Sequence, residues 1–97
     1  MKNNELIDWY VRGANKGKAS NLKIEGDKLI QYETVIAYRM ASRMFCINGD
    51  YYSPTTSRVQ NYLKRQLDSI PTLYLIFDTE EAFYENMNRE EAKSEVV

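Results

Sequence analysis

Histidine is absent from this chain of 97 residues, and cysteine occurs once, at Cys46. Without histidine, the chain lacks the side chain that most often serves as a general base or as a metal ligand. A single cysteine cannot form a disulfide within the chain, and Cys46 lies in an apolar run, where cysteine usually packs as a small core residue. These absences disfavour catalysis, so we expect a protein that is not an enzyme and has no catalytic residue, metal or cofactor.

Long apolar segments are also absent. No stretch approaches the ~20 apolar residues that a membrane-spanning helix needs. The first twelve residues include four charged ones and contain no apolar run of the kind that marks a secretory signal. A free cysteine also suits a reducing compartment. We therefore expect a cytoplasmic protein without membrane contacts, located in the host cell if a phage encodes it.

The composition that is present is that of one globular domain. Hydrophobic residues make up 43% of the chain and charged residues 28%, both near the averages for folded domains. The length suits a single domain over residues 1–97. The last residues, 92–97, offer no apolar anchor, and we expect them to form a frayed tail.

Hydrophobic periodicity predicts an α+β fold. A first helix is expected from Asn3 or Asn4, either of which would cap it, to Gly13. The segment 13–20 holds two glycines and two lysines and is expected to be a mobile loop. Strands are predicted at 21–25, 28–32, 34–40, 43–47, 51–53 and 72–77, and further helices at 56–69 and 78–91. The order α-β-β-β-β-β-α-β-α indicates a twisted, mostly antiparallel sheet of five to six strands with about three helices packed on it.

Most of this prediction depends on two turn and helix-start signals. Gly26-Asp27 separates two alternating segments and is typical of a tight hairpin turn. Ser53-Pro54 opens a segment whose apolar residues recur every three or four positions, as at the start of an amphipathic helix. The run 72–77 is apolar without alternation, which is typical of a strand buried on both faces, so we place it inside the sheet.

Acidic residues are concentrated at the end of the chain. Residues 78–97 contain seven Asp and Glu against two Lys and Arg, whereas residues 1–77 contain seven against eleven. A helix that carries these carboxylates beside Phe83 and Met87 would offer charge and apolar anchors to a partner protein. The alternative is an ordinary solvated helix. The predicted partner-binding residues are Asp78, Glu80, Glu81, Tyr84, Glu85 and Glu91.

Basic residues give a second candidate surface. The lysines of the glycine-rich segment and the cations of the middle helix would contact phosphates, with exposed tyrosines stacking on bases. The sequence pI of about 5.4 disfavours this nucleic-acid interpretation. Its residues are Arg12, Lys16, Lys18, Arg58, Lys64 and Arg65.

About half of the chain, residues 17–67, also resembles a group of short proteins of unassigned function from bacteriophages and other mobile elements. The resemblance rests on Gly17-x-Ala19-Ser20-Asn21-Leu22-x-Ile24-x-Gly26-Asp27-x-Leu29-x-x-Tyr32-x-Thr34-x-Ile36-Ala37, followed by Thr55-Thr56-Ser57-x-x-Gln60-x-Tyr62-Leu63. It implies no catalytic residues. The acidic, aromatic segment that begins at Glu80 is similar in character to anti-CRISPR inhibitors of host defence, which is an analogy of setting.

Taken together, the residues and the resemblance predict a phage or mobile-element accessory protein. It would bind and inhibit a host nucleic-acid-handling protein such as a CRISPR effector nuclease. Two other functions are left open: a small nucleic-acid-binding regulator, and a non-catalytic scaffold that forms a homo-oligomer through a sheet edge or exposed tyrosines.

Overall fold

The computed structural model describes residues 1–40 and 44–95. Three helices and six strands follow one another in the order α-β-β-β-β-β-α-β-α, and the expected α+β class is confirmed. The elements are α1 (Asn3–Val11), β1 (Lys16–Lys18), β2 (Leu22–Glu25), β3 (Lys28–Gln31), β4 (Thr34–Arg39), β5 (Phe45–Asn48), α2 (Pro54–Asp68), β6 (Tyr74–Phe77) and α3 (Glu80–Glu95).

The six strands form one mixed sheet whose spatial order, β1-β2-β3-β4-β5-β6, follows the chain. The first five strands pair antiparallel with their neighbours. β6 returns after α2 and pairs with β5 in parallel, from Phe45 opposite Tyr74 to Asn48 opposite Phe77. A parallel pair needs a crossover, and α2 supplies it.

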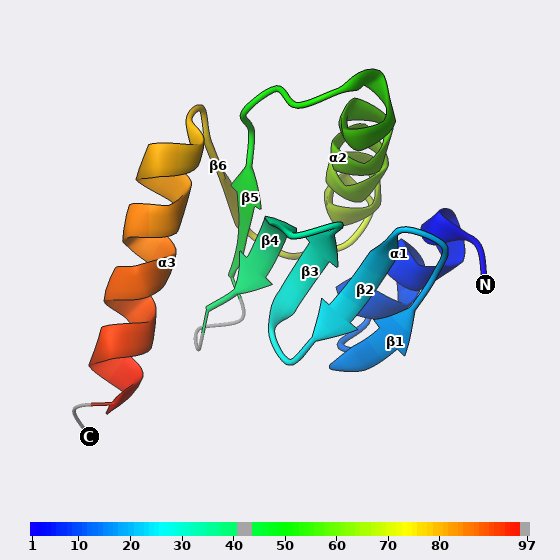
Figure 1. Cartoon of the computed structure of the whole chain (residues 1–97). Helices are drawn as coiled ribbons and strands as arrows, with labels where there is room; N and C mark the ends of the chain where they lie inside the picture. The colour runs from blue at the N-terminus through cyan, green and yellow to red at the C-terminus, as the bar shows by residue number, and fades with distance from the viewer. Residues whose placement is uncertain (41–43, 96–97) are drawn as a thin grey trace.

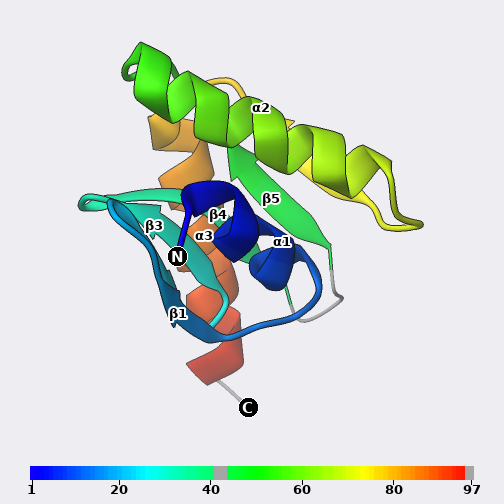
Figure 2. The same cartoon turned by 90° about the vertical axis from the view of Figure 1, so that its right-hand side faces the viewer.

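Helices cover both faces of the sheet. Figure 1 shows α3 on one side of the sheet and α1 with α2 on the other, and Figure 2 shows α1 and α2 in front of the strands. The larger core lies under α1 and α2, where Leu6, Tyr10 and Leu63 pack against strand residues such as Ile36 and Ile47. The smaller core lies under α3.

Three turn and capping signals act locally as expected. Gly26 joins β2 to β3 with a φ of 61°, which is the conformation that a Gly-led hairpin turn requires. The Ser53 side chain accepts a hydrogen bond from the Thr56 N–H and caps α2, with Pro54 in its first turn. Thr79 accepts from the Ala82 N–H at the start of α3.

The matching element order conceals two errors in the predicted strands. The expected loop 13–20 contains β1, because Gly17 lets this segment lie flat on α1; a Cβ there would stand 2.7 Å from Leu6 Cδ1. The expected strand at 51–53 does not form. Asn48 Oδ1 accepts from the Asp50 N–H and turns the chain away, and β6 occupies the free side of β5.

The prediction that residues 72–77 lie inside the sheet is also wrong. β6 is an edge strand, with β5 as its only neighbour among the described residues. The apolar run predicted burial on both faces, but Leu75 and Ile76 are exposed, and the run carries no information on which strands flank it.

Smaller corrections concern the element ends. Neither Asn3 nor Asn4 caps α1; Lys2 precedes the helix without a side-chain cap, and Asn3 instead donates to Asn21 Oδ1. The strand expected at 43–47 begins at Phe45, and Arg43 lies outside the described residues. α3 includes residues 92–95, which were expected to fray, because Ala, Lys and Glu favour a helix. Residues 96 and 97 lie outside the described part.

Candidate functional site

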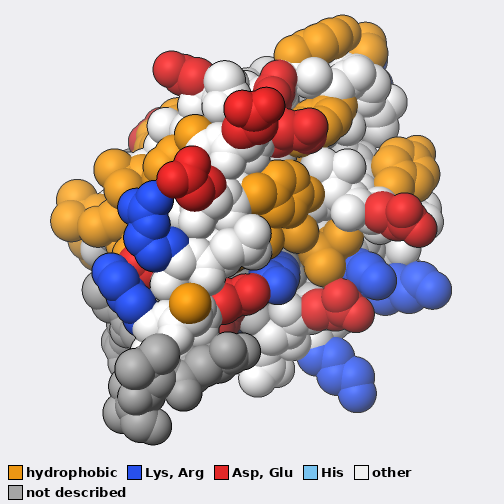
Figure 3. Space-filling view, turned by 60° about the vertical axis from the view of Figure 1, so that its left-hand side comes forward, with side chains coloured by type: hydrophobic (Ala, Val, Ile, Leu, Met, Phe, Trp, Pro, Cys, Tyr) orange, Lys and Arg blue, Asp and Glu red, His pale blue; other side chains and the backbone are white. Residues whose placement is uncertain are grey.

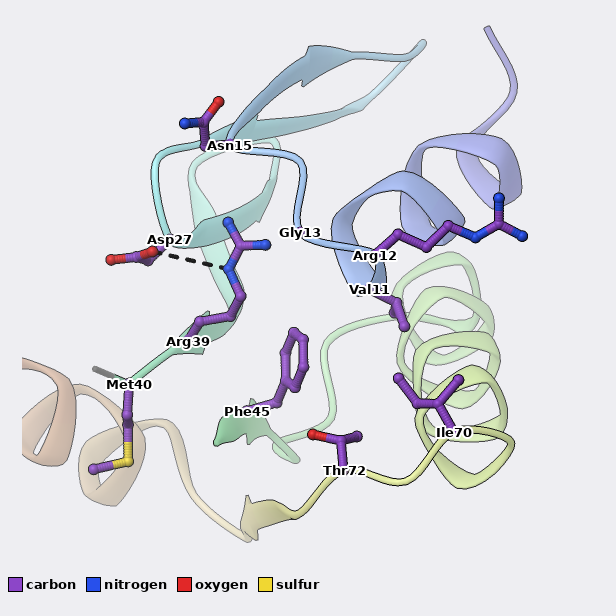
Figure 4. Close-up of a pocket in the computed structure, with 10 residues that line it drawn as sticks. All are labelled: Val11, Arg12, Gly13, Asn15, Asp27, Arg39, Met40, Phe45, Ile70 and Thr72. Atoms are coloured by element: carbon purple, nitrogen blue, oxygen red, sulfur yellow. Dashed lines mark ion pairs between the residues drawn. The ribbon is translucent and has the colours of Figure 1, made fainter. Parts of the chain in front are cut away.

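A cavity of about 610 Å³ lies between the end of α1, the β2–β3 turn and the start of β5. Figure 4 shows Arg39 entering it from β4, while the Arg12 side chain extends away from it. Arg39 Nη1 donates to Tyr10 O, and Nη2 donates to Ala14 O and Gly26 O, all at 2.9–3.0 Å. Its Nε lies 3.8 Å from Asp27 Oδ1.

These bonds identify Arg39 as a structural residue. One guanidinium joins α1, the segment after it and the hairpin turn, and it also stacks 4.8 Å from the Tyr10 ring centroid. Three of the five N–H donors of Arg39 are bonded to backbone carbonyls and its Nε lies beside Asp27, so most of its bonding capacity serves the fold. The cavity therefore does not carry a candidate function.

A second place to search is the carboxyl end of the parallel pair β5–β6, where α2 and α3 leave toward opposite faces. Open α/β sheets bind ligands at such a point. Here the chain's own polar groups occupy it. Asp50 Oδ2 accepts from the Glu80 N–H at 2.9 Å, and Tyr52 donates to Glu80 Oε2 at 2.6 Å. The Gln60 amide donates to Asn48 O and Asp50 O.

Burial and the neighbouring Glu80 carboxylate raise the pKa of Tyr52 above the ordinary tyrosine value. Tyr52 is protonated at neutral pH, as tyrosine ordinarily is, and the raised pKa keeps it a donor to more alkaline pH. The Asp50 carboxylate caps the first turn of α3, the position where an anionic ligand would otherwise bind. We interpret this hydrogen-bond network as a structural feature that fills the carboxyl end of the β5–β6 pair.

The acidic residues predicted to bind a partner are dispersed around α3. Glu80 bonds to Tyr52, as described above, and Glu85 pairs with Arg89 at 2.9 Å. Glu91 pairs with Lys28 on β3 at 2.6 Å. Asp78 and Glu81 are exposed and form no ion pair within the described part of the chain. Figure 3 shows acidic and basic side chains interspersed on this side of the molecule.

The apolar anchors expected beside these carboxylates are not at the surface. Phe83 and Met87 are buried against the sheet, and Phe83 packs edge-on against Phe77 and Tyr84. Tyr84 is half-buried, and its hydroxyl accepts from the Val35 N–H at 3.0 Å. Phe83 and Met87 therefore hold the helix on the sheet and are buried from a partner, whereas Tyr84 is partly exposed and its role in binding stays a prediction.

The six predicted basic residues do not form one surface. Arg58, Lys64 and Arg65 lie on α2, and Arg12 lies at the end of α1 on the same side of the sheet. Gly17 faces α1, and side chains alternate along a strand, so Lys16 and Lys18 point to the opposite face. A nucleic acid would have to cross the edge of the sheet to contact both groups.

The surface that the sequence did not predict is the open edge of β6. Leu73 is 71% exposed, Leu75 48% and Ile76 43%, although these residues belong to one continuous apolar run. Ile70, at 36%, extends the patch toward the end of α2. The apolar run itself was visible in the sequence; its place at the edge was not.

The described residues contain no helix that is long and apolar enough to cross a membrane. In the same residues, no group of three or more His, Cys, Asp and Glu side chains is placed to hold a metal ion. Cys46 is free and buried, as expected for a core residue.

Comparison with known proteins closes the description of these surfaces. No protein-family model matches the chain, and neither the curated proteins nor the solved structures yield a match.

Proposed function

We propose that this chain is a non-catalytic binding protein that recognises another protein through strand addition at the open edge of β6. The observation that supports this most is the exposure of Leu75 and Ile76 on β6 and of Leu73 just before it, with one side of the strand unpaired among the described residues. Such an edge presents a row of free backbone N–H and C=O groups, which a partner strand satisfies.

The edge lacks the features that usually protect it. Residues 72–77 contain no charged residue and no proline. Soluble proteins commonly place charges or proline on a free edge strand to prevent unwanted pairing. Burying one fully exposed large aliphatic side chain contributes ~1.5–3 kcal/mol. Leu73, Leu75 and Ile76 are each about half exposed or more, so a partner that covers all three gains a substantial part of its binding free energy from them.

The adjacent charges favour a partner that is basic near one end of the paired strand. Asp78 follows β6 directly, and Glu81 lies one residue into α3; both are exposed. A host nucleic-acid-handling protein, such as a CRISPR effector, has basic surfaces of this kind, and it remains our proposed partner class. Contact with carboxylates at the end of the strand would fix the direction in which the partner strand binds.

The test is an affinity purification from the host cytoplasm with two sets of variants. The Leu73→Lys/Leu75→Lys variant should lose the partner, because it places charges on the edge. Tyr51→Lys, at a position 68% exposed and outside β6, is the matched control and should retain it. Far-UV circular dichroism verifies that each variant is folded.

The second set of variants tests whether the partner binds the β6 edge or the acidic helix α3. Glu81→Lys/Glu85→Lys should reduce the amount of captured partner only moderately. If charge reversal abolishes capture while the β6 variant still binds, the working surface is α3 and the strand-addition proposal is wrong.

A homo-oligomer is favoured by one specific feature of the same strand. In a two-fold antiparallel pairing centred on Leu75, Tyr74 would lie opposite Ile76 of the second copy and Leu73 opposite Phe77, so that no like charges face each other. Sedimentation velocity tests this: a dimer that Leu75→Lys converts to monomer supports self-pairing, and a monomer at all concentrations rejects it.

A further inference from the structure

We propose that a cavity at the β1–β2 end of the sheet binds a nucleotide unit, with Lys18 and Lys23 contacting phosphate and Tyr32 stacking on the base. In the sheet, β1 and β6 are the two opposite edges. The site is therefore separate from the edge proposed above to bind a protein.

The cavity has a volume of about 270 Å³ and is formed by β1, the turn to β2, the start of β2 and the β3–β4 turn. None of the described residues that line it is acidic. They are Lys18, Ala19, Ser20, Asn21, Leu22, Lys23 and Tyr32.

Two lysines line this cavity side by side. Lys18 and Lys23 are direct partners in the antiparallel β1–β2 ladder, so their side chains lie on the same face of the sheet. Like charges directly opposite each other destabilise a sheet. The next pair in the same ladder that points to this face, Lys16 and Glu25, has opposite charges. Lys18 has no ion-pair partner among the described residues, and Lys23 has only Glu25, at 3.6 Å.

Tyr32 supplies the second observation. Its φ of 55° lies in the left-handed region, and it is the only described non-glycine residue with a positive φ. A bulky side chain in this conformation costs ~1–2 kcal/mol, and glycine or asparagine is usual there. Packing does not offset that cost, since the side chain is 68% exposed. Strain of this kind is concentrated at binding sites.

Asn21 also lines the cavity and bonds to the Tyr32 hydroxyl. Its Oδ1 accepts from Asn3 Nδ2 at 2.8 Å and from Gln31 Nε2 at 3.2 Å, which fixes the orientation of the amide. The Nδ2 group is thereby directed toward the Tyr32 hydroxyl, 3.4 Å away. A bond of this length is weak, so Asn21 retains donor capacity for a ligand in the cavity.

The chemistry of the lining selects the ligand class. Two ammonium groups and an amide donor recognise an anion with several oxygens, and an exposed aromatic ring recognises a flat heterocycle. A nucleotide combines both groups. Because a single-stranded nucleic acid and a free mononucleotide share this chemistry, the experiment includes both.

The experiment measures fluorescence anisotropy of a short, fluorescein-labelled oligothymidylate at ~20 mM salt, where phosphate contacts are strongest. Unlabelled AMP and ATP are added as competitors. Competition by a mononucleotide at a concentration similar to that of the unlabelled oligonucleotide identifies a free-nucleotide site, and competition by the oligonucleotide alone identifies a strand-binding site. Absence of binding by the oligonucleotide and both mononucleotides overturns the proposal.

The variants are chosen so that loss of binding cannot arise from unfolding. Tyr32→Gly removes the ring and relieves the positive φ, so its melting temperature should be equal or higher while affinity falls about tenfold. Tyr32→Phe keeps the ring and should bind within about twofold of the native chain.

Lys18→Gln/Lys23→Gln removes the like-charge pair, so it should also be at least as stable, and it should lower the salt dependence of binding by about one to two in the log–log slope. The matched control is Lys64→Gln/Arg65→Gln on α2, which lies on the other face and should bind unchanged. Equal loss in the control, or full binding by Tyr32→Gly, contradicts the assigned site.

Discussion

Gln60 acts at the scale of a single residue as the brace between α2 and the chain that leaves β5. It is buried, and its amide donates to Asn48 O at 2.7 Å and to Asp50 O at 2.9 Å. Replacing it by Leu removes the donor to the buried Asn48 carbonyl and to the partly buried Asp50 carbonyl, which we expect to lower the free energy of unfolding by ~1–3 kcal/mol. Urea denaturation measures this loss, and Asn61→Leu on the exposed side of α2 should change stability far less.

Tyr10 links stability to alkaline pH. Burial raises the pKa of its hydroxyl above the ordinary value, although the Arg39 guanidinium opposes this shift. Above the ordinary tyrosine pKa of ~10, the unfolded chain releases a proton that the folded chain retains, so the folded state becomes less stable as pH rises. Below that pH the contribution is fully present.

We therefore expect the free energy of unfolding to fall above pH ~10 by up to ~1.4 kcal/mol per pH unit for each such tyrosine. Tyr38 adds to the fall, since burial raises its pKa as well. Urea titrations at a series of alkaline pH values test this. Tyr10→Phe should show a shallower decline than the native chain, and an identical decline would contradict the assignment.

At the scale of the elements, Gly49 determines how closely β6 approaches the end of β5. A Cβ at this position would stand 2.8 Å from Phe77 O and 2.7 Å from Ile76 Cγ2. The first of these atoms belongs to the backbone and moves only if the strands separate. Gly49→Ala should therefore lower stability by ~1–3 kcal/mol and accelerate hydrogen exchange in β6.

Gly26→Asn serves as the control for this prediction. Gly26 adopts a positive φ but has open space where a Cβ would lie, and asparagine tolerates that conformation. Its stability should change by less than ~1 kcal/mol. If both variants lose stability equally, steric contact with β6 is not the reason why position 49 is a glycine.

At the scale of the whole molecule, two cores share one sheet, so they should unfold together. Phe83 lies in the smaller core under α3, whereas Trp9, the only tryptophan, lies on α1 across the sheet. Phe83→Ala should cost ~3–5 kcal/mol. The loss should appear equally in Trp9 fluorescence and in far-UV circular dichroism, and separate midpoints would show that the two faces unfold independently.

The surfaces of the molecule follow from how the elements are placed, and sequence reasoning anticipated them only in part. Alternation and turn residues were sufficient to predict the hairpin of β2 and β3 and the cap of α2, because these features depend on neighbours within a few residues. Asp78 and Glu81, which were predicted to bind a partner, are exposed, and their role in binding stays a prediction. The ion pairs of Glu85 and Glu91 were not predicted. Glu85 pairs with Arg89 one turn away on α3, and Glu91 pairs with Lys28 on β3.

What the sequence by itself determined is the α+β class and most of the element boundaries, since hydrophobic period and helix caps are local properties of the chain. Tertiary structure decided that residues 16–18 pair as a strand and that 51–53 do not, because both outcomes depend on which neighbour is close enough to bond. It also decided that the most apolar strand lies at an edge. The apolar run specified neither the burial of this strand nor its place, because strand order is set by the crossover of α2, through contacts between residues far apart in the sequence.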